Sequence, residues 1–385
     1  MARFSVPLLT LCLFVVTFSV NVQAPLYPAY VAASGLGAMA ATVAFAAYVA
    51  GLLPTFIFLG GLSDRVGRRL PTICALLLGG GATLLLALSP GWPQLVIARV
   101  FLGVATGLVT TSGTAYMTEL MGEAHARRAA LMVTSATSLG FGGGALATGI
   151  SLVVQGPSFA PISFWALIAA VPLLVMACLA LPRIAMPQDK PMLRLPVFPI
   201  GSAPYGIAIA LSWASTGMTI AMVPLLLDRQ GLGGWSGAVI FLAVLGGLLC
   251  QPLAGRLTNP RALAVGLCLI PLGFAALLTG AITGSISLIL LGTALTSASS
   301  YGFTYLSGLS QFSLLAPDDR ARTTAGFFIY AYCGLCLPVV AAGALADWLG
   351  LAPAMAVFFC VQLACLASLV LYRRILRGDA RQELV

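Results

Sequence analysis

The sequence predicts an all-α membrane protein with twelve transmembrane helices arranged in two pseudo-symmetric six-helix bundles. Three observations predict this fold: an apolar composition, recurring charge-poor runs, and a repeat of about half the chain length. Of the 385 residues, 60% are hydrophobic and only 8% are charged, with a mean hydropathy of +1.05. A typical soluble domain is about 25% charged, and a disordered chain needs low hydrophobicity. The composition therefore excludes both classes.

The charge-poor runs define the number of spans. A helix needs about 20 mostly apolar residues to cross a bilayer, and runs of this kind recur between short clusters of Gly, Pro and Arg. They are continuous, unlike the alternating segments of an outer-membrane barrel. The predicted spans are 6–26, 38–59, 71–89, 94–117, 129–154, 162–181, 200–226, 236–254, 262–280, 286–312, 324–345 and 353–372.

The basic residues predict the orientation. If the N-terminus is cytoplasmic, every Lys and Arg except Arg99 and Arg229 lies in a cytoplasmic loop or tail, as the positive-inside rule requires. Both termini are therefore predicted to be cytoplasmic. The net charge of +9 reflects this topology, and we expect contact with the lipid bilayer and not with nucleic acid. The absence of an Asn-x-Ser/Thr acceptor favours a bacterial inner membrane.

Two loops repeat along the chain. Arg65 and Arg256 follow the second and eighth predicted spans, and Arg127 and Arg320 follow the fourth and tenth. The repeat predicts an N-terminal bundle at 1–181, a cytoplasmic linker at 182–199, and a C-terminal bundle with a short tail at 200–385. Such duplication is typical of secondary transporters, in which the substrate site lies between the halves near the midplane.

The most specific motif follows the second span. In Gly60-Gly61-Leu62-Ser63-Asp64-Arg65-Val66-Gly67-Arg68-Arg69, Gly60 and Gly67 permit close approach and a tight turn. Arg68 and Arg69 favour the anionic inner surface. Asp64 can make charge-assisted bonds that a conformational change breaks and remakes.

This motif resembles the G-x-L-a-D-r-x-G-r-k signature of the major facilitator superfamily. The resemblance implies that Asp64 and Arg65 belong to a latch that stabilises the outward-facing state. The C-terminal copy departs from the pattern, because Gly255 stands at the Asp position. Glu119, near the end of the fourth span, matches an acid that many family members use to engage this loop. A plain solvated acid at a helix end is the alternative.

Arg99 is the one charge well inside a predicted span. A central Arg costs about 2.5–3.5 kcal/mol on the insertion scale, so such residues mark function. Leu95-x-x-x-Arg99-x-x-x-Gly103 resembles the family's fourth-helix signature, in which the Arg is implicated in proton coupling. The alternative is an Arg that extends to the outer surface. The fifth span carries Gly140 and Gly144 of the family's antiporter signature, but Ala145 replaces its proline.

Polar and aromatic residues inside spans are the candidates for a substrate cavity. No Asp or Glu lies in the middle of a span, so an anionic or neutral ligand is favoured over a cation. Each candidate could instead make a hydrogen bond between helices or be an aromatic residue at the membrane–water interface. The candidates are Asn21, Gln23, Tyr27, Arg99, Trp213, Thr216, Tyr301, Tyr305 and Tyr330.

These features predict a secondary active transporter that works by alternating access and is not an enzyme. The short loops and the Pro25-Leu26-Tyr27-Pro28 end of the first span resemble the drug-efflux branch of the family. The preferred function is therefore proton-coupled efflux of a small organic compound by a monomer. We expect no metal or other cofactor, because the nine cysteines lie inside spans and the single histidine, His125, lies in a loop.

Two alternatives to efflux stay open. One is an importer or facilitator of a small metabolite. In one version of this alternative the metabolite is an anion and Arg99 is its counter-charge. The other is a non-transporting receptor or scaffold on the same fold.

Overall fold

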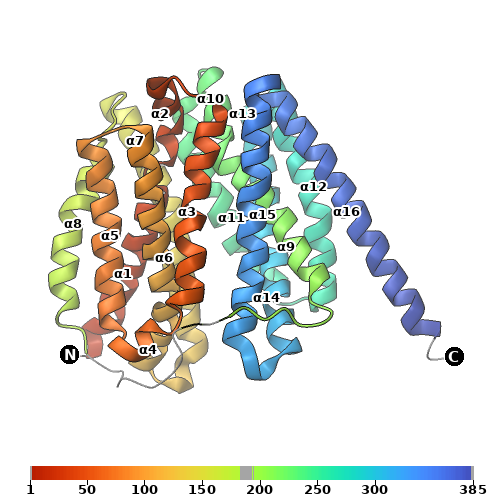
Figure 1. Ribbon diagram of the computed structural model, residues 1–385, viewed down its shortest axis with the longest axis horizontal. Helices are drawn as coiled ribbons and strands as arrows, with labels where there is room; N and C mark the ends of the chain where they lie inside the picture. Colours follow the sequence, from red (N-terminus) through yellow and green to blue (C-terminus); the bar gives the residue numbers. More distant parts are fainter. Residues whose placement is uncertain (1, 183–192, 194, 383–385) are drawn as a thin grey trace. The chain divides into compact units, whose positions relative to one another are not determined.

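A computed structural model describes residues 2–182, 193 and 195–382, and within these ranges every regular element is helical (Figure 1). The first half contains α1 (Ala2–Asn21), η1 (Ala24–Leu26), α2 (Tyr27–Ser34), α3 (Ala38–Phe58), α4 (Leu62–Val66), α5 (Arg69–Leu88), α6 (Trp92–Met121), η2 (Glu123–His125), α7 (Ala126–Gln155) and α8 (Ile162–Cys178).

The second half contains a matching series of long and short helices. They are α9 (Ala203–Ala221), α10 (Val223–Arg229), η3 (Gly233–Trp235), α11 (Ser236–Ala254), α12 (Asn259–Thr283), α13 (Ile286–Ser297), η4 (Ala298–Phe303), α14 (Thr304–Leu315), η5 (Pro317–Asp319), α15 (Arg320–Leu349) and α16 (Leu351–Gln382). Of the predicted linker, residues 183–192 and 194 lie outside the described ranges.

The twelve predicted spans are confirmed. Eleven segments of the described chain are long and apolar enough to cross a membrane, and the shorter apolar helix Ile162–Cys178 supplies the twelfth. One clear difference is at the first span, which runs over Phe4–Ser34 where the sequence predicted 6–26. The predicted span ended at residue 26, within Pro25-Leu26-Tyr27-Pro28, and the chain instead resumes a helix at Tyr27.

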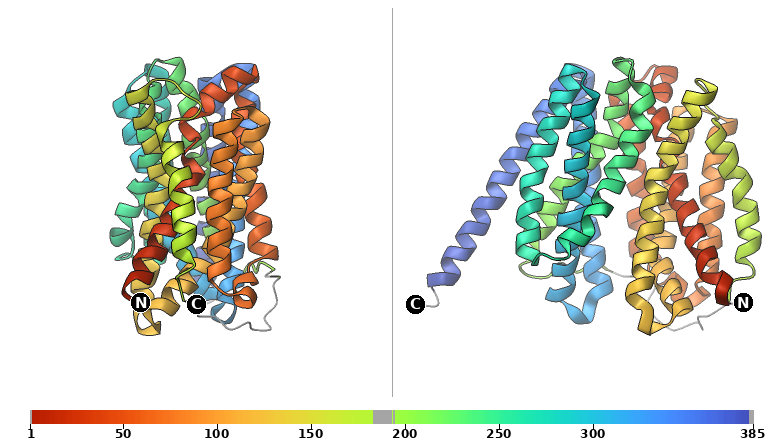
Figure 2. Two further views of the ribbon diagram at one scale, coloured as in Figure 1. Left: turned by 90° about the vertical axis from the view of Figure 1, so that its left-hand side faces the viewer. Right: turned by 180° about the vertical axis from the view of Figure 1, so that it is seen from behind.

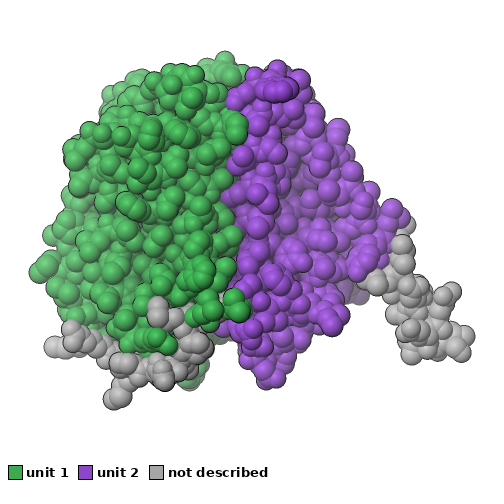
Figure 3. All heavy atoms as spheres, in the orientation of Figure 1, with its two compact units in different colours: residues 1–195, 220–245 green, residues 196–219, 246–385 purple. Residues whose placement is uncertain are grey.

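By contacts the chain forms two compact units (Figure 3). Unit 1 consists of residues 1–195 and 220–245, and unit 2 consists of residues 196–219 and 246–385. Figure 2 shows the helices of each unit from two further sides. The two units are defined by contacts between residues, whereas the predicted bundles were defined by the repeat in the sequence. The predicted division of the chain at 182–199 therefore stays a prediction.

Glycines allow helices of unit 1 to pack with their backbones in contact. A Cβ at Gly103 of α6 would meet the carbonyl oxygen of Tyr48 in α3, and one at Gly51 would meet the carbonyl of Val100 in α6. Small residues drive helix association in membranes in this way, because close backbones gain van der Waals contact. Gly103 therefore has a packing role that follows directly from its surroundings.

We expect Gly103→Val to destabilise the protein, because its side chain would force α3 and α6 apart. Overpacking typically costs about 1–3 kcal/mol, so the unfolding temperature in detergent should fall by at least about 3 °C. Gly81→Val is the matched control, since no atom lies within 4 Å of a Cβ at exposed Gly81. Equal unfolding temperatures for the two variants would contradict the packing role.

Candidate functional site

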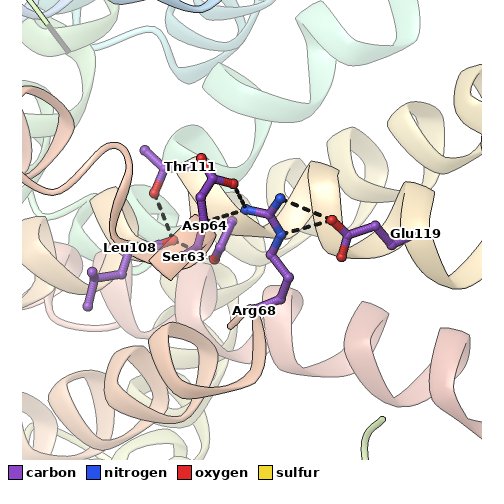
Figure 4. A network of polar contacts seen from close by, with 7 residues as sticks. Ser63, Asp64, Arg68, Leu108, Thr111 and Glu119 are labelled. Carbon is purple, nitrogen blue, oxygen red and sulfur yellow. Dashed lines mark hydrogen bonds and ion pairs between the residues drawn. The ribbon is translucent and has the colours of Figure 1, made fainter. Parts of the chain in front are cut away.

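Arg68 connects the loop after α3 to the end of α6 (Figure 4). Its Nη1 lies 2.6 Å from Asp64 Oδ1 and donates to Ser63 Oγ at 2.6 Å. Its Nη2 lies 3.0 Å from Glu119 Oε1, and its Nε donates to the same oxygen at 3.1 Å. One guanidinium therefore binds two carboxylates on two different elements, which is the rigid fork geometry that favours Arg over Lys.

The cluster is largely removed from solvent. Asp64 is 7% exposed and Ser63 is 3% exposed. Burial lowers the pKa of Arg68, but its hydrogen bond to Glu119 and the charges of Glu119 and Asp64 outweigh this and raise the pKa above its ordinary value. Arg68 therefore stays cationic at every physiological pH. The ion pairs in Figure 4 can be broken by movement but not by deprotonation of Arg68.

The neighbouring Arg69 connects the start of α5 to the residues that directly follow α8. Its Nη1 donates to the carbonyl oxygens of Leu179 at 2.7 Å and Leu181 at 3.4 Å. Tyr116 of α6 donates from its hydroxyl to the Pro182 carbonyl at 2.8 Å. Cations and other donors are favourable at helix C-termini because the last carbonyls have no partner within the helix. Consecutive arginines thus contact the ends of α6 and α8.

The other residues of the motif, Gly60, Arg65 and Gly67, lie outside the Arg68 ion pairs. Arg65, which the resemblance pairs with Asp64 in the latch, is exposed, and the ion pairs at Asp64 and Glu119 described above are made by Arg68. Gly60 is buried in the turn between α3 and α4, and Gly67 has a φ of +84°. That conformation is strained for any residue with a Cβ, so Gly67 permits the sharp exit from α4.

Arg99 is buried between α6, α1 and α3, with 1% exposure. Its Nη1 donates to the carbonyl of Val20 at 2.7 Å, and its Nη2 donates to the carbonyl of Phe45 at 3.2 Å. The guanidinium carbon lies 5.4 Å from the Phe45 ring centroid and 4.9 Å from that of Tyr48. Cation–π contacts of this kind are strengthened by desolvation.

Arg99 has no carboxylate partner within the described residues, and its Nε has no hydrogen-bond acceptor there. Its burial excludes the alternative in which the side chain extends to the outer surface. A backbone carbonyl carries only a partial charge, so the site compensates the cation with dipoles and aromatic faces. This arrangement holds α6 against two earlier helices.

The first-span candidates surround the break after α1. Gln23 is fully buried, and its Nε2 donates to the Val20 carbonyl at 2.8 Å, the acceptor that Arg99 also uses. Asn21 donates to the carbonyl of Phe141 in α7 at 2.9 Å, and Tyr27 is fully buried at the start of α2. Gln23 Oε1 is a buried acceptor without a partner in the described chain. Gln23 and Arg99 are therefore brought together.

Three candidates of unit 2, Trp213, Tyr301 and Tyr305, form an aromatic group together with Tyr332, which was not among the candidates; we call this group the Trp213 cluster. The Trp213 ring centroid lies 5.4 Å from Tyr301, 6.4 Å from Tyr305 in a stacked pair, and 5.1 Å from Tyr332 edge to face. The spacing of Tyr301 and Tyr305 predicted that they share one face, and both contact the same indole. Tyr301 and Tyr305 are half-buried, so the cluster retains accessible ring surface.

Further rings extend the Trp213 cluster along α15. Tyr305 lies 5.9 Å from Phe327, which lies 5.3 Å from Phe312, and Phe312 lies 6.3 Å from the predicted residue Tyr330. Phe327 belongs to the apolar pattern of a spanning helix, so no signal in the sequence separates it from core.

Hydroxyl groups line the other side of Trp213. The indole Nε1 donates to the Ser300 carbonyl at 3.3 Å, and Thr216 donates to Ser300 Oγ at 2.9 Å. Ser212 and Thr304 hydroxyls lie 2.9 Å apart. Ser300 belongs to η4, a π-helical turn at residues 298–303. Such turns occur frequently at functional sites because they redirect side chains and free backbone groups.

Sequence reasoning missed the π turn and Gln362. The Gln362 side chain in α16 is 2% exposed and donates to the Leu211 carbonyl at 2.9 Å and Ser215 Oγ at 2.8 Å. The sequence signal for the π turn was the run of Ser and Thr residues over 293–313. The signal for Gln362 was a lone amide side chain in an apolar span.

Comparisons with known proteins agree with this architecture. The family model of the Major Facilitator Superfamily matches residues 9–337. A bacterial homologue of the human lysosomal transporter Spinster, solved inward-facing and unoccupied, has a TM-score of 0.78 and 14% identity, with 98% of each chain covered. The nucleoside transporter NupG, solved as a point mutant, has a TM-score of 0.78 and 12% identity, covering 96% of this chain and 99% of that one. No curated protein shows a significant match.

The resemblance seen in the sequence is therefore confirmed over most of the chain. The two solved structures share the fold at an identity too low to indicate a common substrate. The family consists of transporters and not enzymes, which agrees with the multi-pass helical architecture. The chain belongs to the major facilitator superfamily and is a multi-pass membrane transporter.

Proposed function

We propose that this transporter carries a small, ring-bearing organic compound by alternating access and exports it in exchange for protons. The observation that supports the substrate class is the Trp213 cluster, in which aromatic faces lie beside the hydroxyls of Thr216 and Ser300. Ligand sites combine apolar and aromatic walls with a few placed polar groups. The cluster thus suits a flat apolar ring with one or two hydrogen-bonding substituents.

The charge of the substrate is constrained by the acids. Asp64 and Glu119 are engaged with Arg68 at the end of the spans, and Asp228 and Asp347 are exposed near helix ends. A buried organic cation needs a compensating charge, because burying an unpaired charge is costly. We therefore propose a neutral or anionic substrate.

The Arg68 cluster, formed by Ser63, Asp64, Arg68 and Glu119, is the proposed conformational element. Its ion pairs join the loop after α3 to α6, so a movement of these elements relative to each other requires that they break. Asp64 and Glu119 are the carboxylates that this element offers for proton coupling. The efflux direction rests on the sequence resemblance to the drug-efflux branch.

The test uses energised inside-out vesicles, a pH-sensitive dye, and a panel of neutral, anionic and cationic ring compounds. Compound-dependent proton release with neutral or anionic members, lost in Asp64→Asn, supports antiport export. Equilibration of labelled compounds without proton release would replace antiport by facilitated transport. No flux of any compound would favour the receptor or scaffold alternative.

Trp213→Ala should weaken substrate binding, because it removes the ring that contacts three tyrosines. An aromatic pair contributes about 0.5–1.5 kcal/mol beyond its buried area, so KM should rise by a factor between about two and ten. Trp348→Ala is the matched control, since Trp348 is 89% exposed at the end of α15. Radiolabelled flux at several concentrations measures both, and an unchanged KM for Trp213→Ala would exclude the cluster as the site.

Arg68→Gln and Glu119→Gln should be coupled in stability. Each single variant loses the 3.0 Å ion pair, so the double variant should cost less than the sum of the singles, by about 1 kcal/mol. Thermal unfolding of the four proteins in detergent measures this coupling. Arg127→Gln combined with Glu119→Gln serves as the control and should be additive. Additivity in both cycles would contradict the contact.

A further inference from the structure

A groove runs between the first halves of α1 and α7 in unit 1. Figure 2 (right) shows the two helices crossing side by side on the face turned toward the viewer, α1 in red and α7 in yellow. The groove has a volume of about 580 Å³, and its lining extends from Pro7 to Phe14 on α1 and from Arg128 to Leu139 on α7.

Both walls are regular helix faces. On α1 the lining residues Pro7, Thr10, Leu11 and Phe14 follow the i, i+3, i+4, i+7 spacing of a single face. The lining of α7 corresponds to about 16 Å of helix. One leaflet of the hydrocarbon core is about 15 Å thick. The groove therefore matches one leaflet in length.

Apart from Arg128, the lining carries two hydroxyl groups, those of Thr10 and Ser135, and is otherwise apolar. Thr10 donates its hydroxyl to the Val6 carbonyl at 2.8 Å within α1, so its methyl group is what remains for the groove. Leu11, Leu131 and Leu139 are exposed by 47%, 57% and 41%. In a membrane protein such a surface is covered by acyl chains.

The exception is Arg128 at one end of the groove. It is exposed and makes no ion pair or hydrogen bond within the described chain. The distribution of Lys and Arg places this end on the cytoplasmic side, where the leaflet carries anionic lipids. An unpaired cation above a leaflet-long apolar groove complements an anionic headgroup above an acyl chain.

We propose that this groove is a binding site for an anionic phospholipid. The acyl chain lies between Leu11 and Leu131, and the phosphate contacts the Arg128 guanidinium. This site is separate from the Trp213 cluster and from the Arg68 cluster, and it does not depend on what the protein transports or in which direction.

The test is native mass spectrometry of the full-length protein in detergent with phosphatidylglycerol or phosphatidylcholine of identical chains. We expect phosphatidylglycerol to be retained about fivefold better than phosphatidylcholine, because this is the gain in affinity that one Arg near an anionic group provides. Arg128→Ala should abolish this preference. Arg127→Ala is the control, because the adjacent exposed residue does not line the groove.

A second pair of variants tests the acyl-chain position. Ser135→Trp fills the groove, which Ser135 lines, and should reduce retention of both lipids at least about fivefold. Ala130→Trp places the same bulk on exposed α7 surface outside the groove and should have no effect. Unfolding temperatures within about 2 °C of wild type verify that the variants fold.

Several outcomes would overturn the site. They are equal retention of the two lipids by wild type, equal effects of Arg127→Ala and Arg128→Ala, or full retention by Ser135→Trp. Competition by water-soluble glycerol phosphate at lipid concentration would mean that the site binds a free anion. Loss of lipid on dimerisation, seen in the same spectra, would mean that a second copy covers the groove.

Discussion

The constraint on which this structure depends is that a backbone inside a bilayer must satisfy its hydrogen bonds within the protein. Regular helices satisfy these hydrogen bonds within themselves, so unsatisfied backbone groups arise where helices are interrupted. The first span breaks at η1, where Pro25 has no N–H to donate. The carbonyls of Val20 and Val22 near this break accept from Arg99 and from Thr148, at 2.7 Å and 2.6 Å. At this break, polar side chains of unit 1 satisfy backbone carbonyls.

Unit 2 meets the same constraint with neutral groups. At its π turn, the Ser299 carbonyl accepts from Thr304 at 2.7 Å, and Ser299 itself donates to the Gly266 carbonyl at 2.9 Å. Hydroxyls satisfy the interruption without introducing charge, which leaves the aromatic faces around Trp213 in an uncharged environment. The two units thus differ in chemistry although the chain repeats in sequence. This difference is the physical basis for proposing that substrate recognition lies in unit 2.

The sequence predicted the twelve spans because length, charge and hydropathy are enough to define a helix that crosses a bilayer. It also identified Arg99, because a charge inside a span is conspicuous. It did not identify the partners of Arg99, because the acceptors are backbone carbonyls, which every residue type carries. Arg68 was assigned to the membrane surface because its contact with Glu119 joins residues far apart in the sequence, which the motif alone does not reveal.

The surroundings of Arg99 also have a consequence for how the chain enters the membrane. Both acceptors of its guanidinium, Val20 and Phe45, lie earlier in the chain, in the first two spans. During synthesis the N-terminal segments emerge first, so both carbonyls leave the ribosome before Trp92–Met121 does. The insertion penalty of a central arginine, about 2.5–3.5 kcal/mol, then falls on a helix whose hydrogen-bond acceptors have already been synthesised. The order of residues in the gene matches the order in which the charge can be accommodated.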